Sequence, residues 1–216
     1  MHRKKELQQL FSANRKYFGR RVLDLACGGG ALGFLLEPHG HSYFGVDVNS
    51  DMIRSAEAYA AEIRSRNRFV VGDARKISVE DSFDTLTLLG NALIHFNTKE
   101  LRDVLGSVRT NAAEGAYFII DYRDVVSSLF YGTWKWKRRL VQERNGKEVV
   151  SVSKEIDTRA GEIVVDSRSA GRRTLEFTAA IWSPFILQDI MESSSWRLAH
   201  RRALPDRCLD VYRRDW

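Results

Sequence analysis

The sequence lacks the long apolar runs that membrane-spanning helices need. Nowhere in its 216 residues do ~18 apolar residues follow one another without a charge. The basic opening segment, MHRKKELQQLF, has neither the apolar run nor the cleavage site of a secretory leader. The two cysteines, Cys27 and Cys208, are too few for a disulfide framework. We therefore expect a cytoplasmic protein with reduced thiols and no membrane partner.

Metal-ligand spacings are also missing. The histidines and cysteines do not recur at the short, paired intervals of zinc ligands, so no metal is expected. Charge, in contrast, is plentiful and unevenly spread. Residues 1–21 carry a net +6, residues 22–133 a net −5 and residues 134–216 a net +5. Basic flanks of this kind attract nucleic acid or acidic substrates, or simply form a solvated surface, and the composition leaves these alternatives open.

The first two thirds of the chain alternate between two kinds of segment. Short apolar runs predict strands, and they are RVLDLAC, HSYFGVDV, RFVVGD, SFDTLTLLG and GAYFIID. Segments with helical spacing separate them, such as NSDMIRSAEAYAAEIRS, which begins with a capping residue at Asn49 or Ser50. Strands that alternate with helices indicate an α/β fold around a parallel, Rossmann-like sheet.

After about residue 133 the pattern changes to strands joined by tight turns. Asn145-Gly146 predicts a hairpin, and the runs EVVSVSKEID, EIVVDSRS and RTLEFTAAIW follow. A helix that starts at Ser183 and a final strand pair, WRLAHRRAL and RCLDVYRRD, complete the chain. We expect one domain over 1–216, with 134–182 as an antiparallel β subdomain inserted after the fifth strand.

A glycine-rich loop follows the first strand. Gly28, Gly30 and Gly33 match G-x-G-x-x-G between a strand and a helix, which is also the fingerprint of dinucleotide-binding proteins. Asp24, four residues before the glycines, argues against a dinucleotide, because its carboxylate repels a pyrophosphate. A cationic cofactor with an ammonium group has the opposite preference and favours a carboxylate there.

Two more acids follow the next two strands. Asp47 ends the second strand and Asp73 ends the third, so with Asp24 they fall at the carboxyl edge of the sheet, where α/β proteins bind ligands. Asp47 can accept hydrogen bonds from ribose hydroxyls, and Asp73 can accept one from an adenine amino group. The pattern therefore favours a nucleoside cofactor with a positive charge.

These segments resemble a known family. VLDLACGGG, GVDVNSDMI, VVGDAR and FDTLTLLGN, within residues 20–121, are similar to the successive motifs of class I S-adenosylmethionine-dependent methyltransferases. The resemblance implies a seven-stranded, mostly parallel sheet with an antiparallel last strand, and S-adenosyl-L-methionine as cofactor. It also implies a set of cofactor contacts: Asp24, Ala26, Gly28 and Gly30 at the methionine part, Asp47 at the ribose, Val48, Met52, Asp73 and Ala74 around the adenine, and Leu89 as a further cofactor-binding residue.

The ends of the fourth and fifth predicted strands carry a narrower resemblance. GNALIHF and FIIDYRD are similar to the GNSFAH and VIDHRN stretches of glycine N-methyltransferases and their sarcosine and dimethylglycine relatives. By that resemblance, Arg123 would clamp a substrate carboxylate and Asn91 would orient the amine. His95 would line the pocket or accept a proton. The implied acceptor is the amine of a small, carboxylate-bearing molecule.

Residues near the inserted strands depart from that group. Trp134 and Trp136 in WKWKRR either cage a methylated ammonium or pack under the hairpin, and Phe177 stands where the family has a tyrosine. Two other functions stay open: an RNA or protein methyltransferase that uses the basic flanks, and an NAD-binding oxidoreductase. A homodimer also stays open, because the sequence does not fix the oligomeric state.

Overall fold

A seven-stranded sheet forms the body of the protein. The computed structural model describes residues 2–77, 79–134, 137–141, 148–157, 159–169, 172–204 and 207–215. The strands of this sheet are β1 (Arg21–Leu25), β2 (Ser42–Asp47), β3 (Arg68–Val71), β4 (Phe83–Leu88), β5 (Ala112–Tyr122), β10 (Trp196–Leu204) and β11 (Arg207–Arg214). Their spatial order is β10-β11-β5-β4-β1-β2-β3. All neighbours are parallel except that β11 runs antiparallel to both β5 and β10, which confirms the predicted fold class.

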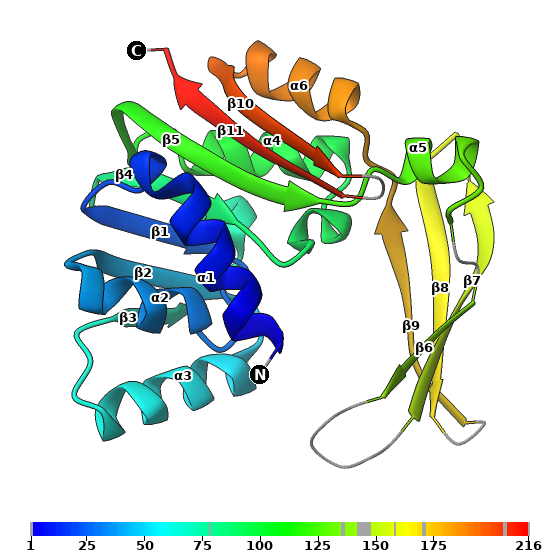
Figure 1. The fold of residues 1–216 in the computed structure, drawn as a ribbon, viewed down its shortest axis with the longest axis horizontal. Coiled ribbons are helices and arrows are strands. Elements are labelled where there is room, and N and C mark those ends of the chain that lie inside the picture. Colours follow the sequence, from blue (N-terminus) through cyan, green and yellow to red (C-terminus); the bar gives the residue numbers. More distant parts are fainter. Residues whose placement is uncertain are drawn as a thin grey trace.

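Helices cover both faces of this sheet (Figure 1). The elements α1 (His2–Asn14), α2 (Ala31–Leu36) and α3 (Ser50–Glu62) lie on one face, and α4 (Thr98–Ser107) and α6 (Pro184–Ser193) lie on the other. Short turns and helices complete this part: η1 (Arg15–Tyr17), η2 (Glu37–His39), η3 (Ala74–Lys76), η4 (Ala92–His95) and α5 (Val125–Phe130).

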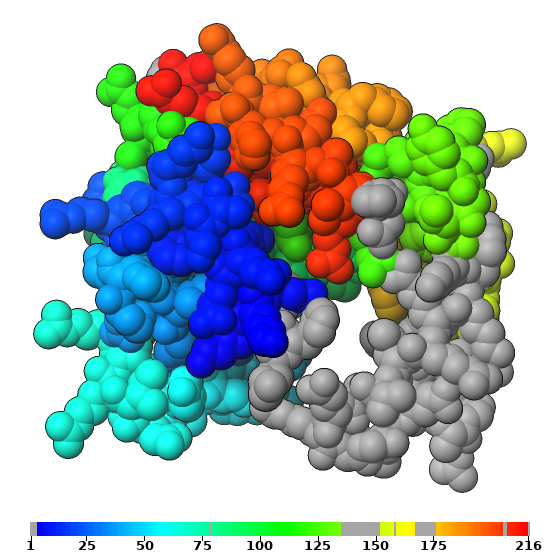
Figure 2. All heavy atoms as spheres, in the orientation of Figure 1, coloured from blue at the N-terminus to red at the C-terminus, as the bar shows by residue number. Residues whose placement is uncertain are grey.

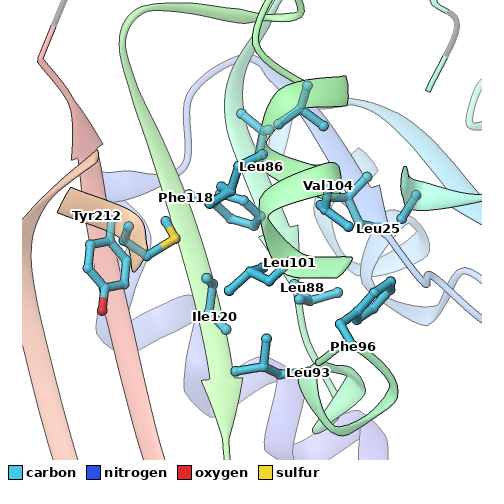
Figure 3. Packing of buried hydrophobic residues seen from close by; sticks show 14 of the residues in the cluster. Leu25, Leu86, Leu88, Leu93, Phe96, Leu101, Val104, Phe118, Ile120 and Tyr212 are labelled. Carbon is cyan, nitrogen blue, oxygen red and sulfur yellow. The ribbon is translucent and has the colours of Figure 1, made fainter. Parts of the chain in front are cut away.

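The period of two along each strand explains this layering. In β1, Val22 packs in the cluster under α1 and α2, whereas Leu23 and Leu25 pack in the cluster under α4 and α6. In β5, Phe118 and Ile120 point toward α4, where Figure 3 shows them packed with the side chains of that helix. Strands buried on both faces are typical of a parallel sheet, as the continuous apolar runs predicted.

A second, four-stranded antiparallel sheet stands beyond the carboxyl edge of the first (Figure 1). Its strands, in spatial order, are β6 (Lys137–Val141), β7 (Glu148–Asp157), β8 (Glu162–Ser169) and β9 (Arg172–Ala180). It is inserted between α5 and α6. The predicted turn at Asn145-Gly146 lies outside the described residues, but β6 and β7, on either side of it, pair antiparallel.

An amino-terminal helix, α1, was not predicted. Leu7 and Phe11, one turn apart, are buried on its inner side, and Asn14 follows on the same stripe. Figure 2 shows this helix in blue, lying across one face of the sheet beside the last two strands. In the described part of the chain, no helix has both the length and the apolar character required to cross a bilayer.

Candidate functional site

A cavity of about 750 Å³ opens at the carboxyl edge of the seven-stranded sheet. Its volume lies within the range of small-molecule and cofactor sites. Nine of the ten residues predicted to contact the cofactor line it: Asp24, Ala26, Gly28, Asp47, Val48, Met52, Asp73, Ala74 and Leu89. The tenth, Gly30, is absent from the lining that the described residues form.

The Asp47 carboxylate ties the glycine loop to the neighbouring strand. Its Oδ2 accepts a hydrogen bond from the Gly28 N–H at 2.7 Å, and its Oδ1 accepts one from the Asn49 N–H at 2.8 Å. Gly28 has a φ of 55°, in the left-handed region that glycine tolerates. The Asn49 side chain in turn accepts hydrogen bonds from the N–H groups of Asp51 and Met52 and so caps α3. One carboxylate thus joins the loop after β1 to the start of α3.

Gly30 has a packing role instead of a place in the lining. Its φ is 71°, and a Cβ atom built on it would lie 2.2 Å from Cε1 of Phe69. The Phe69 ring is buried against this backbone. Glycine is therefore required here because an aromatic ring of β3 approaches the start of α2 closely.

Asp24 is buried below the loop with a hydrogen bond to each carboxylate oxygen. Tyr43 Oη donates to Oδ2 at 2.6 Å, and Thr87 Oγ1 donates to Oδ1 at 2.6 Å. A carboxylate has about four acceptor sites in all, so it can bind several donors at once. Burial, then the charges of Asp24 and Asp47, raise the pKa of the Cys27 thiol, which excludes a thiolate nucleophile in this loop at neutral pH.

Arg75 is a cavity residue that the sequence analysis missed. Its guanidinium donates to both carboxylate oxygens of Asp73, at 2.8 to 3.0 Å, and to Oε1 of Glu100. These hydrogen bonds hold the pKa of the Asp73 carboxyl below its usual range. Glu100 also closes the capping box of α4 with Asn97. Arg75 therefore links Asp73 to α4 through Glu100, which lies 25 residues after Arg75 in the chain.

The charges around the cavity suit a cationic ligand. Among the described residues, the lining holds three carboxylates and one guanidinium, and Asp73 and Glu100 already occupy that guanidinium. A pyrophosphate would meet repulsion here, whereas an ammonium or sulfonium would be stabilised. In the described part of the chain, no cluster of three His, Cys, Asp or Glu side chains is arranged to hold a metal ion.

The other end of the cavity lies at turn η4. His95 and the adjacent Phe96 line it, and the exposed His95 ring faces the ring of Phe177 in β9, with centroids 6.0 Å apart. Leu7 of α1 also reaches the lining, so the amino-terminal helix forms part of the cavity wall. The inserted sheet therefore meets the first sheet at the predicted substrate residue His95.

The other predicted substrate residues, Asn91, Arg123 and Trp134, lie outside the lining formed by the described residues. Asn91 joins the ends of β4 and β5: its N–H donates to Oδ1 of Asp121, and its Oδ1 accepts from the Arg123 N–H, both at 3.0 Å. Trp134 is half-buried after α5, and its backbone N–H donates to the Ser128 carbonyl at 2.9 Å. Trp136 lies outside the described residues.

Comparison with known proteins gives the family of this fold. Residues 22–115 match a family model described as a methyltransferase domain. A glycine N-methyltransferase of Mus musculus is 27% identical over 124 residues, which cover 51% of this chain and 42% of that protein. Residues 22–115 therefore carry a methyltransferase domain, within the sheet order of the class I S-adenosylmethionine-dependent methyltransferases. Its cofactor is S-adenosylmethionine, which has the positive charge that the three carboxylates favour.

Solved structures extend the similarity to the whole chain. The PH0226 protein from Pyrococcus horikoshii OT3 is 27% identical, with a TM-score of 0.77 over 99% of this chain and 90% of that one. The sugar N-methyltransferase KedS8 from Streptoalloteichus is 20% identical, with a TM-score of 0.70 over 99% of this chain and 87% of that one. By contrast, the chain spans less than half the length of the mouse glycine N-methyltransferase.

The crowding at Gly30 leads to a prediction on stability. We expect Gly30→Ala to lower the free energy of unfolding by roughly 1–3 kcal/mol, because the new methyl group collides with the buried Phe69 ring. Gly29→Ala is the matched control, since nothing lies within 4 Å of its Cβ position. Chemical denaturation of both variants measures the difference. Equal unfolding free energies would contradict the packing role of Gly30.

The Arg75–Asp73 contact leads to a prediction on pH. In Arg75→Gln the pKa of Asp73 rises toward its usual value, so the carboxylate protonates at a higher pH than in the wild type. If Asp73 accepts from the adenine amino group, the loss of S-adenosylhomocysteine affinity on acidification then begins at a higher pH. Calorimetric titrations between about pH 4 and pH 7 measure this shift. Arg54→Gln, which breaks an exposed ion pair with Asp51, is the control. An identical acid limb in all three proteins would refute the link.

Proposed function

We propose that this chain transfers a methyl group from S-adenosylmethionine to the amine of a small molecule. The arrangement of the cavity carries the proposal. One end is acidic, with carboxylates at or near the carboxyl ends of three successive strands, and the other end places an imidazole, His95, beside Phe177 of the inserted sheet. The first end suits the cofactor, and the second suits an acceptor that gives up a proton.

The chain's own residues would hold the cofactor in three places. Asp24 would accept from its ammonium group, while the main chain at Ala26 and Gly28 would lie close to its methionine part. Asp47 would accept from the ribose hydroxyls. Because the Gly28 N–H already binds Asp47 Oδ2, the methionine and ribose subsites would be fixed relative to one another.

The adenine would lie between Val48 and Met52 on one side and Ala74 and Leu89 on the other. Val48 is 69% exposed and Met52 is 48% exposed, although both are large and apolar. Exposed apolar side chains along a cavity wall favour a ligand with a flat, apolar face. Asp73 would accept from the adenine amino group at the edge of this slot.

When bound, S-adenosylmethionine supplies a methyl group that its positively charged sulfur has already activated. The chain therefore has to align the acceptor and exclude water, and needs little covalent chemistry of its own. The acceptor amine must be unprotonated to attack. His95 would take up a proton from that amine or hold it by a hydrogen bond, and the Phe177 ring would shield the same side from solvent.

A carboxylate on the acceptor would be held by Arg123, whose guanidinium can donate two parallel hydrogen bonds. Asn91 would orient the amine, and its link to the Arg123 N–H would keep both residues in register. Trp134 would contribute an aromatic wall next to the inserted sheet. We propose that 134–182 acts as a substrate cap within one domain over 1–216.

The names of the similar proteins agree with an amine acceptor. The mouse relative is a glycine N-methyltransferase, and KedS8 is a sugar N-methyltransferase. Both names specify transfer to nitrogen, on molecules of different size and charge. We therefore propose N-methylation of a small molecule and leave the carboxylate as the feature that the experiment decides.

The test is S-adenosylhomocysteine production with a panel of acceptors. The panel contains glycine, sarcosine, dimethylglycine, amino sugars and bulk RNA in separate reactions. We expect turnover on at least one amine. With a carboxylate-bearing acceptor, Arg123→Ala should raise KM about 10- to 100-fold, the loss of a charged hydrogen-bonded pair. Arg197→Ala, which removes an exposed arginine on β10, is the control.

Two outcomes would contradict parts of this proposal. Turnover on RNA alone would move the function to the basic flanks. An unchanged KM in Arg123→Ala would contradict the carboxylate clamp while leaving N-methylation in place.

His95→Gln should lower kcat without changing S-adenosylhomocysteine affinity, because the imidazole lies at the proposed acceptor end.

A further inference from the structure

Turn η4 connects the cofactor cavity to the interior of the protein. Its residue His95 and the following Phe96 both line the cavity. Leu93, from the same turn, is fully buried, and Figure 3 shows Leu93 and Phe96 packed beside Leu101 of α4. A small displacement of this turn would therefore move the His95 imidazole relative to the cavity.

A tryptophan beyond the inserted sheet holds both ends of this turn. The Trp182 indole N–H donates to the Leu93 carbonyl at 2.9 Å and to the Phe96 carbonyl at 3.0 Å. The Trp182 side chain is 1% exposed, so water does not compete for these carbonyls. A single donor shared by two acceptors fixes the turn in one orientation.

Trp182 also lies where the chain enters and leaves the inserted sheet. It follows the end of β9 at Ala180 by two residues, and its carbonyl accepts from the N–H of Val125, the first residue of α5. Because α5 precedes the inserted sheet and β9 ends it, both connections meet at this residue. A second contact, between Phe177 of β9 and His95, also joins the inserted sheet to turn η4.

We propose that Trp182 is a positioning residue that fixes the His95 imidazole at the acceptor end of the cavity. Its indole N–H holds turn η4 in register with the inserted sheet, so that the two close the acceptor site as one unit. The role of His95 at the acceptor amine rests on the proposed function. The hydrogen bonds of Trp182 do not reach β1, β2, β3 or the loops after them, which carry the three carboxylates of the cofactor end.

The test compares two conservative substitutions of buried tryptophans. Trp182→Phe removes the indole N–H but keeps an aromatic ring in the core. Trp196→Phe is the control, because Trp196 is also buried, packs edge-on against Phe118, and lies in β10 away from the cavity. Both variants are expected to lose stability, so stability alone does not distinguish the roles.

The first readout is the position of the His95 ring resonances in the S-adenosylhomocysteine complex, assigned with His95→Gln. We expect these resonances to shift in Trp182→Phe and to stay unchanged in Trp196→Phe. In both variants the affinity for S-adenosylhomocysteine should remain within about twofold of the wild-type affinity. A twofold change is well below the tenfold change that corresponds to about 1.4 kcal/mol. This readout needs no acceptor, so it decides the proposal even if the acceptor class is wrong.

The second readout is turnover with any acceptor found in the panel. Trp182→Phe should lower kcat on the order of 10- to 100-fold, as expected for a misplaced reacting group, while Trp196→Phe stays near the wild type. Unmoved His95 resonances in Trp182→Phe, or kcat values equal in the two variants, would overturn the proposal. If Trp182→Phe does not fold, Trp182→His, which keeps a ring N–H, should restore the His95 resonances and kcat, and failure to do so would also overturn it.

Discussion

The pairing of Asp47 with Gly28 is the constraint on which the cofactor end of the site depends. The 2.7 Å hydrogen bond from the Gly28 N–H holds the loop after β1 against the end of β2, in a backbone conformation with φ near 55°. The same carboxylate accepts from Asn49, whose side chain starts α3. Loop, strand and helix therefore meet at one side chain, which also lines the cavity.

The two ends of the cavity are built in different ways. The cofactor end is local, since each of its acids lies at or within two residues of the carboxyl end of a strand of the first sheet. The acceptor end is assembled from distant parts of the chain: turn η4, Phe177 of β9 and Trp182 after it. In the function that we propose, such a division would let the inserted sheet vary the acceptor without disturbing the cofactor subsites.

Much of this fold was predictable because local and global patterns agree. The apolar runs gave the strands, Asn49 was one of the two residues predicted to cap α3, and the acids at the strand ends line one cavity. Contacts over long sequence separations were not predictable. Nothing in the local sequence marks Arg75 as a cavity residue, and Leu7 lies in a basic segment without a clear apolar pattern. Gly30 matches the glycine motif, but a glycine is needed there because the Phe69 ring packs against its backbone. Trp182 lies 89 residues after Leu93, whose carbonyl it binds, and no local sequence pattern predicts a contact over that separation.

The acidic cavity should bind the adenosyl and methionine parts of the cofactor, which S-adenosylhomocysteine, the product of methyl transfer, also has, and calorimetric titration tests this most directly. S-adenosylhomocysteine and NAD would be titrated separately into the wild-type protein and into Asp47→Ala. We expect S-adenosylhomocysteine to bind the wild type and NAD not to bind it. Asp47→Ala should lose about 1–3 kcal/mol of the S-adenosylhomocysteine affinity through its missing ribose hydrogen bonds. Binding of NAD in preference to S-adenosylhomocysteine, or an Asp47→Ala affinity equal to that of the wild type, would contradict this expectation.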